Sequence, residues 1–302
     1  MLKDFEIIFP KELVGNIKIN EPMKNHTTFK IGGPCDVMIE PKSYEQLLNA
    51  LKIIKDNNLE YYIIGNGSNL LVTDKGLRKV VIKINEKLSN IEVNGETIIA
   101  QAGALLSTVA KKSFKYNLTG LEPMSGIPGG IGGAITMNAG AYGGEMKDVV
   151  SSVKVITKDL EIKDYNLEEM NLRYRNSRVQ DEGLIVLEVT MKLQKGDPIK
   201  IKEIYDDLTE KRVTKQPLEF ASAGSTFKRP EGYFAGKLID DSGLRGYRYN
   251  DAQVSEKHCG FVINRGNATY KDIMEVIHHV QNIVMDNFGV KLEPEIRIIG
   301  EQ

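Results

Sequence analysis

The chain has 302 residues, which is longer than one small core requires and suits two or three substructures. Hydrophobic residues make up 41% and charged residues 27% of the sequence, as in ordinary globular proteins, which argues against extensive disorder. The formal net charge is −1, so no overall positive field attracts nucleic acid or anionic lipid. We therefore expect no nucleic-acid partner and no membrane partner.

The N-terminus and the cysteines point to the cytoplasm. Residues 1–13 show neither the apolar region nor the cleavage site of a signal peptide. No stretch reaches the roughly 18 apolar residues that are needed to span a bilayer. Cys35 and Cys259 lack a metal-ligand or disulfide-framework spacing, so we expect them to be reduced and structural. The adjacent His278 and His279 would point about 100° apart on a helix, and no metal site is expected.

The first part of the chain shows helix and strand patterns in turn. Ser43 and Gln46 form a potential capping box, and apolar residues then recur at helical spacing until about Asn57. Runs rich in β-branched and aromatic residues predict strands, and the order suggests a small βαβ unit. The further elements predicted here are strands at 61–64, 80–84 and 97–102 and a helix at 107–116.

The second part begins with a change in composition at residues 195–198, which is a plausible domain boundary. Two of its helices end before Gly243 and Gly289. Pro294 interrupts the last strand, so that strand should lie at a sheet edge or carry a bulge. Before this boundary, strands are predicted at 153–157 and 184–193. Beyond it, helices are predicted at 201–213, 235–241 and 270–287 and a strand at 292–299.

Residues 120–144 are unusual, because roughly two in five are glycine and charge is nearly absent. A flexible Gly/Ser linker would be polar. This segment instead contains apolar residues such as Leu121, Met124 and Ile135, which should be buried. A buried, glycine-rich backbone leaves no room for side chains, so we expect it to pack against a flat cofactor or a phosphate.

A second candidate is the segment Ile64-Gly65-Asn66-Gly67-Ser68-Asn69, named here the Gly65 loop, which follows a predicted strand. Its backbone N–H groups and polar side chains could bind phosphate oxygens without a cation. A plain turn explains this segment alone equally well. It matches neither the G-x-G-x-x-G fingerprint nor a P-loop, which disfavours a Rossmann or kinase interpretation. Together with the amides of residues 124–134, it suits a pyrophosphate held by neutral donors.

Six short motifs in order make the chain resemble the UDP-N-acetylenolpyruvoylglucosamine reductase family, from about residue 20 to residue 300. Each motif alone could arise by chance, whereas six in sequence are specific. Three resemble the FAD-binding half of that family and three resemble its catalytic motifs: residues 25–33, the Gly65 loop and 125–142, then 174–178, 224–227 and 292–297.

The resemblance implies an α+β protein, with an FAD-binding fold of the vanillyl-alcohol-oxidase type and a C-terminal substrate-binding α+β domain. Residues 1–195 would form the FAD-binding region, as two α/β subdomains at about 1–85 and 86–195. Residues 196–302 would bind substrate, and the last strand could return to the FAD-binding region.

The cofactor implied by the resemblance is FAD. We expect it to be non-covalent, because neither His nor Cys occurs in residues 65–72 or 125–144. The expected FAD contacts are Ile64, Gly65, Asn66, Gly67, Ser68, Asn69, Ser125, Gly126, Ile127, Pro128, Gly129, Gly132, Ala134, Asn138, Gly140, Ala141, Tyr142 and Ile185.

The family's reaction reduces the enolpyruvyl ether of a UDP-sugar to a lactyl ether, with NADPH as the co-substrate. NADPH reduces the flavin, and the substrate then takes hydride at C3 and a proton at C2. By resemblance, Arg175 and Glu295 polarise the substrate carboxyl and Ser225 donates the proton. The planar fork of an arginine suits a carboxylate, and Glu295 helps only as a protonated hydrogen-bond donor. Taken singly, these residues are typical of a solvated loop, a turn and an exposed strand edge.

Substrate binding is implied by further cationic and loop residues. The segment between Asn176 and Ile185 is too short for the tyrosine loop of some members, so the chain resembles the shorter subtype. We expect small-molecule partners only, and a monomer or weak oligomer. The expected substrate contacts are Tyr174, Arg175, Lys215, Gly224, Arg229 and Lys237.

Two alternatives remain open. The first is an FAD-dependent oxidase of the same fold that acts on a small sugar or hydroxy acid. The second is a non-catalytic module that binds flavin or nucleotide. Reduction of the flavin by NADPH would distinguish the reductase from the oxidase. If Arg175, Ser225 and Glu295 were dispensable for every measurable turnover, the non-catalytic module would be indicated.

Overall fold

The computed structural model describes residues 4–301. The chain divides into two compact units, each assembled from segments that are separated in sequence. Each unit has its own hydrophobic core, which is what allows a unit to be compact. The first unit contains the residues up to Ile19, Val37–Asn66 and Lys79–Lys211, and the second contains Asn20–Asp36, Gly67–Arg78 and the residues from Arg212 onward.

The boundaries of these compact units differ from the predicted division at 195–196. That division separates an FAD-binding region from a substrate-binding region, and it remains a prediction about function. One consequence concerns the Gly65 loop. The boundary between the units falls inside this loop, between Asn66 and Gly67. The loop therefore contributes residues to both units.

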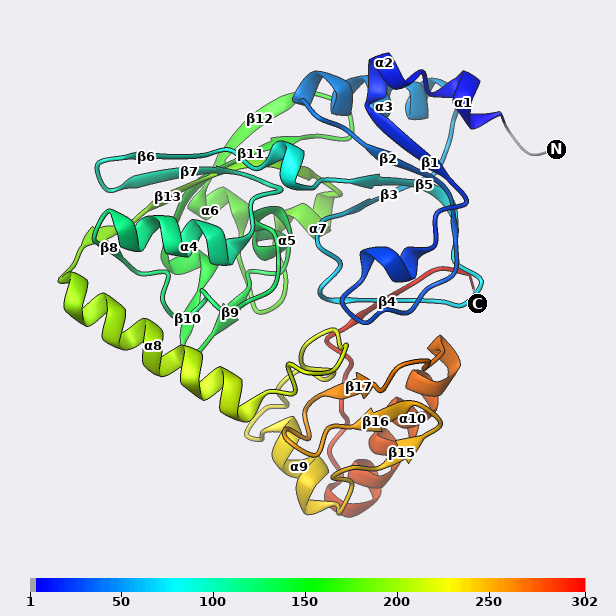
Figure 1. Cartoon of the computed structure of the whole chain (residues 1–302), viewed down its shortest axis with the longest axis vertical. Coiled ribbons are helices and arrows are strands. Elements are labelled where there is room, and N and C mark those ends of the chain that lie inside the picture. The colour runs from blue at the N-terminus through cyan, green and yellow to red at the C-terminus, as the bar shows by residue number, and fades with distance from the viewer. Residues whose placement is uncertain (1–3, 302) are drawn as a thin grey trace. The chain divides into compact units, whose positions relative to one another are not determined.

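Two sheets form the frame of the first unit (Figure 1). In the smaller sheet β3 and β5 are parallel and β1 is antiparallel to β2. The larger sheet is antiparallel throughout. Along its central strands β7, β11 and β13, buried residues alternate or nearly alternate with more exposed ones, as expected for a sheet with one covered face. The strand orders are β1 (Asn16–Ile19), β2 (Cys35–Glu40), β5 (Leu77–Lys83), β3 (Tyr61–Ile64), and β12 (Ile162–Asn166), β11 (Val150–Ile156), β13 (Ile185–Lys192), β7 (Thr97–Gln101), β6 (Ile91–Asn94).

The predicted first helix is confirmed as α3 (Tyr44–Asp56), which buries Leu47, Leu51 and Ile54. Half of its predicted capping box is wrong. Ser43 Oγ accepts the N–H of Gln46 at 3.2 Å, but Gln46 Oε1 accepts the N–H of Lys42, at 2.9 Å, rather than that of Ser43. The long glutamine side chain therefore caps a residue one position further from the helix.

The remaining helices of the first unit are mostly short. The long α8, which runs on into the second unit, begins at Pro198, three residues before the predicted start, because proline is well suited to the first position of a helix. Its only buried residue among those described is Ile201. These elements are α1 (Phe5–Ile8), α2 (Lys11–Val14), α4 (Leu106–Lys115), α5 (Ile131–Thr136), α6 (Leu167–Met170), α7 (Arg178–Glu182) and α8 (Pro198–Lys215), with η2 (Glu86–Leu88), η3 (Met146–Asp148), β8 (Leu118–Thr119), β9 (Gly140–Ala141), β10 (Gly144–Glu145) and β14 (Gln194–Lys195).

The second unit is built around α10 (Tyr270–Phe288), which packs on a three-stranded antiparallel sheet (Figure 1). Its predicted apolar stripe, from Ile273 to Val284, is buried apart from Ile283, which is partly buried against the same core. Gly289 ends the helix with a φ of 65°. The other elements are η1 (Met23–His26), β4 (Leu70–Val72), α9 (Ala235–Asp241), β15 (Arg248–Tyr249), β16 (Ala252–Val254), β17 (Val262–Asn264) and β18 (Arg297–Ile299).

The last strand is shorter than predicted, because only β18 pairs regularly, in parallel with β4. Pro294 has no N–H and makes only an isolated antiparallel bridge to Phe227. Two hydrogen bonds flank this bridge: Glu295 N–H to the Thr226 carbonyl and Lys228 N–H to the Glu293 carbonyl, both at 2.8 Å. The segment that carries Ser225 is thereby joined to the segment that carries Glu295.

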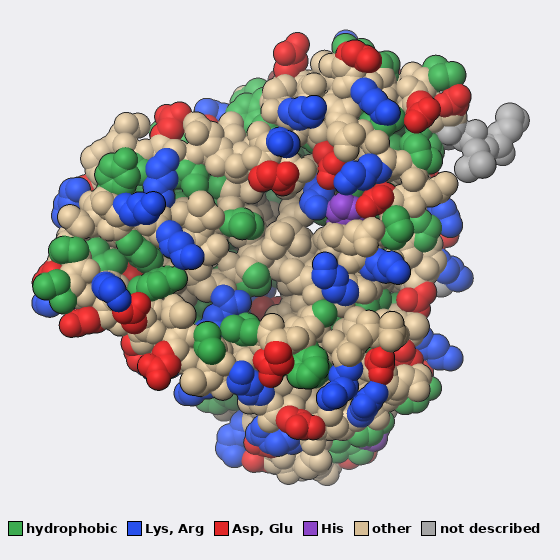
Figure 2. Space-filling view, in the orientation of Figure 1, with side chains coloured by type: hydrophobic (Ala, Val, Ile, Leu, Met, Phe, Trp, Pro, Cys, Tyr) green, Lys and Arg blue, Asp and Glu red, His purple; other side chains and the backbone are tan. Residues whose placement is uncertain are grey.

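Two expectations about the whole chain can be compared with the structure. Cys35 and Cys259 are free and buried, as predicted. Within residues 4–301, no helix combines the length and the apolar character that crossing a bilayer would require. On the face seen in Figure 2, basic and acidic side chains are interspersed, in keeping with the net charge of −1.

Candidate functional site

The Gly65 loop connects β3 to β4 and presents an unpaired stretch of backbone. None of the N–H groups of residues 65–69 donates a hydrogen bond to another group within residues 4–301. Backbone donors that the fold leaves unsatisfied need water or a ligand, and successive N–H groups of this kind form a nest for an anion. The loop therefore has the donor set that a diphosphate requires.

The two glycines of this loop differ in what their surroundings allow. A side-chain carbon added at Gly65 would meet no atom within 4 Å. One added at Gly67, whose φ is 64°, would lie 2.1 Å from the main-chain oxygen of His26. Gly67 is therefore required by the fold itself. Gly65 leaves open space next to the unpaired N–H groups, as expected where a ligand approaches the backbone.

The polar side chains of this loop differ in whether they hydrogen-bond to the rest of the described chain. Asn66 Nδ2 donates to the main-chain oxygen of Pro128 within the first unit. Asn69 Nδ2 donates to the main-chain oxygen of Glu295, at 3.2 Å, within the second. Ser68 makes no hydrogen bond to the rest of the described chain. One amide hydrogen of each asparagine is thus used by the protein, and the Ser68 hydroxyl is left for a ligand.

The glycine-rich segment is buried through its apolar side chains, as predicted, with Leu121, Met124 and Ile135 fully buried. Its glycines pack partly against the protein. A side-chain carbon at Gly132 would lie 3.0 Å from the Ala102 side chain, so this glycine serves contact between α5 and the end of β7. Gly133, in contrast, faces open space. The expectation that this backbone packs against a cofactor can therefore apply to only part of the segment.

Glu122 organises the start of this segment and was missed in the sequence. It is 2% exposed, and its carboxylate accepts the Thr119 hydroxyl at 2.6 Å and the Gly120 N–H at 2.7 Å. Its main-chain oxygen accepts the hydroxyl of Ser125, a predicted FAD contact, at 2.7 Å. An acidic residue inside an otherwise uncharged segment was the signal that could have identified it.

Asn138 is also more structural than predicted. It is fully buried, and its side chain donates to Glu145 and to the Arg173 carbonyl while accepting the Lys147 N–H. Tyr142 is 46% exposed, and Ile185 is buried in β13. The remaining predicted FAD contacts lie in the Gly65 loop, in the loop before α5, in α5, or in β9: Ile64, Gly126, Ile127, Gly129, Ala134, Gly140 and Ala141.

Arg175 lies at the tip of a tight turn in the first unit. Arg173 and Asn176 pair across the turn through N–H to carbonyl bonds of 2.9 and 3.2 Å, and Arg175 adopts the left-handed conformation with a φ of 55°. Its guanidinium carbon lies 4.9 Å from the centre of the Tyr174 ring, which is half exposed. The turn therefore presents Arg175 and Tyr174 together.

Gln180 anchors this turn and was also missed in the sequence. Its Nε2 donates to the Arg175 carbonyl, at 3.2 Å, and to the Thr136 carbonyl at the end of α5. Ser177 Oγ donates to the same Thr136 carbonyl at 2.9 Å. The arginine turn and the glycine-rich segment are thus joined by side-chain hydrogen bonds within one unit.

Ser225 and Glu295 lie in the second unit. Thr226, between Ser225 and the core, is fully buried: its N–H donates to the Gly260 carbonyl at 2.8 Å and its hydroxyl accepts the Val262 N–H at 2.9 Å. Ser225 itself is half-buried, and its hydroxyl makes no hydrogen bond within residues 4–301. The structure therefore brings Ser225 and Glu295 to neighbouring, paired segments, while Arg175 belongs to the first unit.

The remaining predicted substrate contacts lie in the second unit, and most are exposed. Lys215 ends α8 and is exposed, and Gly224 has a φ of 77° beside open space. The Arg229 guanidinium stacks 4.0 Å from the centre of the exposed Phe234 ring. Lys237 is paired with Asp241 at 2.7 Å, and that pairing raises the pKa of its ammonium group.

His258 is half-buried and lies beside Gly260, whose carbonyl accepts the Thr226 N–H. His258 Nδ1 accepts the Gly260 N–H at 3.1 Å, and burial lowers the pKa of this imidazole, assisted by the charge of Arg245. Burial raises the pKa of the Cys259 thiol to about 11, and that of Cys35 to about 12. No group of three or more possible metal ligands occurs within the described residues.

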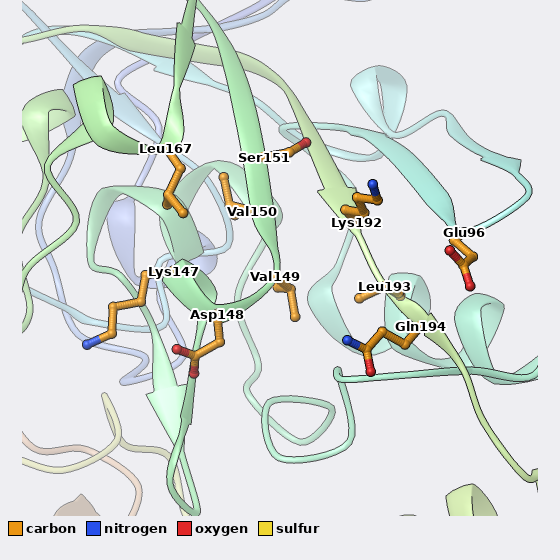
Figure 3. A pocket seen from close by; sticks show the side chains of 10 residues that line it. All are labelled: Glu96, Lys147, Asp148, Val149, Val150, Ser151, Leu167, Lys192, Leu193 and Gln194. Atoms are coloured by element: carbon orange, nitrogen blue, oxygen red, sulfur yellow. The ribbon is translucent and has the colours of Figure 1, made fainter.

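A surface hollow of about 510 Å³ lies in the first unit (Figure 3). It contains none of the predicted site residues. Its charged side chains are of both signs, and Val149, Val150, Leu167 and Leu193 are its apolar residues. The residues that line it are Glu96, Lys147, Asp148, Val149, Val150, Ser151, Leu167, Lys192, Leu193 and Gln194.

Comparison with known proteins identifies two families of domains. Residues 35–165 match the model of an FAD binding domain, and residues 216–299 match that of the UDP-N-acetylenolpyruvoylglucosamine reductase C-terminal domain. The first match contains both glycine-rich loops and the second contains Ser225 and Glu295. The match at residues 35–165 confirms the expected FAD-binding fold, and FAD is the cofactor. The unpaired N–H groups of the Gly65 loop and the open space at Gly65 fit the diphosphate of such a cofactor.

Full-length relatives agree with these matches. The chain is 55% identical to UDP-N-acetylenolpyruvoylglucosamine reductase of Alkaliphilus oremlandii, over 98% of this chain and 96% of that protein. It is 51% identical to the protein of the same name from Clostridioides difficile, over 95% and 94%. The crystal structure of the enzyme from Thermus caldophilus superposes with a TM-score of 0.81 at 34% identity, covering 94% of this chain and 98% of that one. On these matches, the chain belongs to the UDP-N-acetylenolpyruvoylglucosamine reductase family.

Proposed function

We propose that this chain reduces UDP-N-acetyl-3-O-(1-carboxyvinyl)-glucosamine to UDP-N-acetylmuramate, with NADPH as the electron donor. This reaction supplies a precursor of peptidoglycan, and we expect it to take place in the cytoplasm. The observation that carries the proposal is the pairing of the Ser225 segment with the Glu295 segment, through the Glu295 N–H and the Thr226 carbonyl. This pairing holds a hydroxyl and a carboxyl, the two groups that the second half of the reaction needs, on adjacent backbone.

Bound FAD carries two electrons from NADPH to the enolpyruvyl group of the substrate. The carbon–carbon double bond then gains hydride at C3 and a proton at C2, so the chain itself must provide a proton and stabilise negative charge on the carboxylate. We assign the proton to Ser225. A hydroxyl is a weak acid, and it can act here only against a strongly basic carbon held close to it.

We assign the carboxylate of the substrate to Arg175 and Glu295. The guanidinium group can donate two parallel hydrogen bonds to a carboxylate. The turn at residues 173–176 and its anchor Gln180 support this role, because they restrict the backbone from which the Arg175 side chain extends. Glu295 can add a hydrogen bond to the developing charge when it is protonated.

We assign the FAD diphosphate to the Gly65 loop, where five successive N–H groups have no acceptor among the described residues. The attachment should be non-covalent. The histidine nearest this loop in the chain is His26, which is buried with its Nε2 2.7 Å from Glu21 Oε1, an arrangement that favours a structural role for the ring. Denaturation should release free FAD into the supernatant.

Substrate contacts from Tyr174, Lys215, Gly224, Arg229 and Lys237 remain part of the proposal. We assign the UDP diphosphate to Arg229 and Lys215, which are exposed cations of the second unit. Arg229 also donates through Nε to the Tyr233 main-chain oxygen at 3.3 Å, and Lys237 pairs with Asp241. We expect a monomer or a weak oligomer, which light scattering across a range of concentrations would test.

The deciding experiment is anaerobic. Stoichiometric NADPH should bleach the flavin absorbance, and the enolpyruvyl UDP-sugar should then restore it while one equivalent of UDP-N-acetylmuramate appears by mass spectrometry. Bleaching by a small alcohol or sugar, with no response to NADPH, would instead support the oxidase alternative. NADH in a parallel reaction measures the preference for the phosphorylated nucleotide.

A further inference from the structure

Asn69 joins the Gly65 loop to the segment that contains Glu295, although the two are 226 positions apart in sequence. Its Nδ2 donates to the Glu295 main-chain oxygen at 3.2 Å, and its own main-chain oxygen accepts the Arg297 N–H at 2.8 Å. Immediately beyond, the register of β4 and β18 pairs Leu70 with Arg297. Asn69 therefore begins the strand pairing and adds a side-chain bond to it. All of these residues lie in the second unit.

The backbone of Glu295 is held on both sides. Its N–H donates to the Thr226 carbonyl at 2.8 Å, and its carbonyl accepts the Asn69 amide. Thr226 is itself fully buried and held by the two bonds to Gly260 and Val262. Because these contacts fix the peptide units before and after Glu295, they fix the direction in which its side chain leaves the backbone. Of these contacts, only the one with Asn69 comes from the Gly65 loop.

We propose that Asn69 is a positioning residue for the reaction, whose side chain acts on Glu295 rather than on FAD. The backbone N–H of Asn69 remains available to the diphosphate, while its side-chain amide sets the placement of Glu295 beside Ser225. This inference rests on the proposed function. It assigns Asn69 to the substrate half-reaction, although its place in the Gly65 loop would assign it to the cofactor.

The chemistry of the contact explains why an asparagine is needed. The acceptor is a carbonyl oxygen, so the side chain must donate. Aspartate has the same shape but would place a carboxylate oxygen against the Glu295 carbonyl, which leaves two acceptors facing one another. Alanine removes the donor and leaves the carbonyl to water. Both substitutions should let the Glu295 segment shift, and a displacement of about 1 Å in a reacting group can cost about 100-fold in rate.

The test separates the two half-reactions by anaerobic stopped-flow absorbance at saturating FAD. For Asn69→Ala we expect flavin reduction by NADPH to stay within about threefold of wild type, and reoxidation by the enolpyruvyl UDP-sugar to slow by about 10- to 100-fold. Asn69→Asp preserves the size of the side chain and should show the same difference between the two half-reactions. It replaces the alanine variant in this test if that variant folds poorly. Equal slowing of both halves, or weaker FAD binding with both halves normal, would overturn the proposal.

A double-mutant cycle tests whether the effect passes through Glu295. In a Glu295→Ala background, Asn69→Ala should cost less than about twofold in the substrate half-reaction, because the carboxyl group that the contact positions is already gone, although the main-chain acceptor remains. If the rate loss of the double variant instead equals the product of the losses of the two single variants, the proposal is contradicted. Asn66→Ala is the matched control, since Asn66 Nδ2 donates to Pro128 instead; any loss there should appear as FAD affinity, with no split between the half-reactions. A wild-type flavin that NADPH does not reduce would refute the proposed function instead, before any variant is compared.

Discussion

A side-chain carbon at Gly67 would lie 2.1 Å from the main-chain oxygen of His26, in a residue whose φ is already 64°. Two positions earlier, Gly65 has no atom within 4 Å of the same hypothetical carbon. The two glycines of one short loop are therefore required for different reasons. One accommodates the protein's own backbone, and the other borders the unpaired N–H groups that are suited to a diphosphate.

Alanine at each position should separate these requirements. Gly65→Ala should leave the melting temperature of the apoprotein within about 2 °C of wild type and weaken FAD binding by about 10-fold or more, because the new methyl group fills ligand space. Gly67→Ala should lower the free energy of unfolding by about 3 kcal/mol or more, from backbone strain and a backbone clash. Calorimetry without FAD and fluorescence titration with FAD measure the two effects. A stable Gly67→Ala apoprotein would contradict this view of the loop.

Ser225→Ala should divide the reaction. We expect the NADPH half-reaction to remain nearly normal and substrate reduction to slow by about 10² to 10⁴-fold, because only the second half needs a proton at C2. Stopped-flow measurement of each half gives the ratio directly. Thr226→Ser is a control at the neighbouring buried residue. It keeps a hydroxyl that can accept the Val262 N–H and removes only a buried methyl group, so it should affect stability rather than the ratio. Equal losses in both halves would count against a proton-donor role for Ser225.

Glu295→Gln and Glu295→Ala should differ in degree. Glutamine retains a hydrogen-bond donor for the substrate carboxylate and should lose less activity than alanine in the substrate half-reaction, by about 10-fold. Neither change touches the backbone bonds of Glu295 to Thr226 and Asn69. Single-turnover rates decide the order. A glutamine variant slower than the alanine variant would indicate that Glu295 acts through its charge or as a base.

Gln180→Ala should loosen the Arg175 turn, since it removes the bonds from Nε2 to the Arg175 and Thr136 carbonyls. We expect the KM for the enolpyruvyl UDP-sugar to rise by about 5- to 50-fold, with a smaller change in flavin reduction by NADPH. Gln194→Ala, an exposed glutamine in the same unit, is the matched control and should behave as wild type. An unchanged KM in the Gln180 variant would show that the turn is held by its backbone pairing alone.

The helices and strands that could be predicted from the sequence are those determined by residues close to them in the chain. Helix α3, the apolar stripe of α10 and the strand β3 follow from periodicity and from nearby capping residues, and they were predicted almost to the residue. The last strand was predicted too long, because Pro294 pairs with Phe227, a distant residue that periodicity cannot reveal.

The site shows the same limit. Short motifs located the Gly65 loop, the Arg175 turn and the Ser225 and Glu295 segments, because glycine and polar residues at fixed spacing are visible in a sequence. Glu122 and Gln180 were missed, since what makes them important is a set of hydrogen bonds to main-chain groups that come together only on folding. The commitment of Asn69 to Glu295 was hidden for the same reason.

His258 should make stability depend on pH. Burial lowers the pKa of its imidazole, with a smaller contribution from the charge of Arg245, so the folded state favours the neutral ring below the ordinary pKa of about 6.5. A group whose pKa is lower in the folded state stabilises the fold at higher pH, and this contribution is lost as the pH falls from about 6.5 through the folded pKa. The hydrogen bond that Nδ1 accepts from Gly260 would be lost on protonation at that nitrogen.

The measurement is the free energy of unfolding of the FAD-bound protein between pH 8 and pH 5, for wild type and for His258→Gln. Above pH 7 the variant should be the less stable of the two, because it loses the packing of the ring against Phe261. As the pH falls, the difference should shrink, since only the wild type retains a group that resists protonation. Because Gly260 also accepts the Thr226 N–H, substrate reduction by the wild type should fall over the same range. Parallel stability curves would show that His258 does not titrate on unfolding.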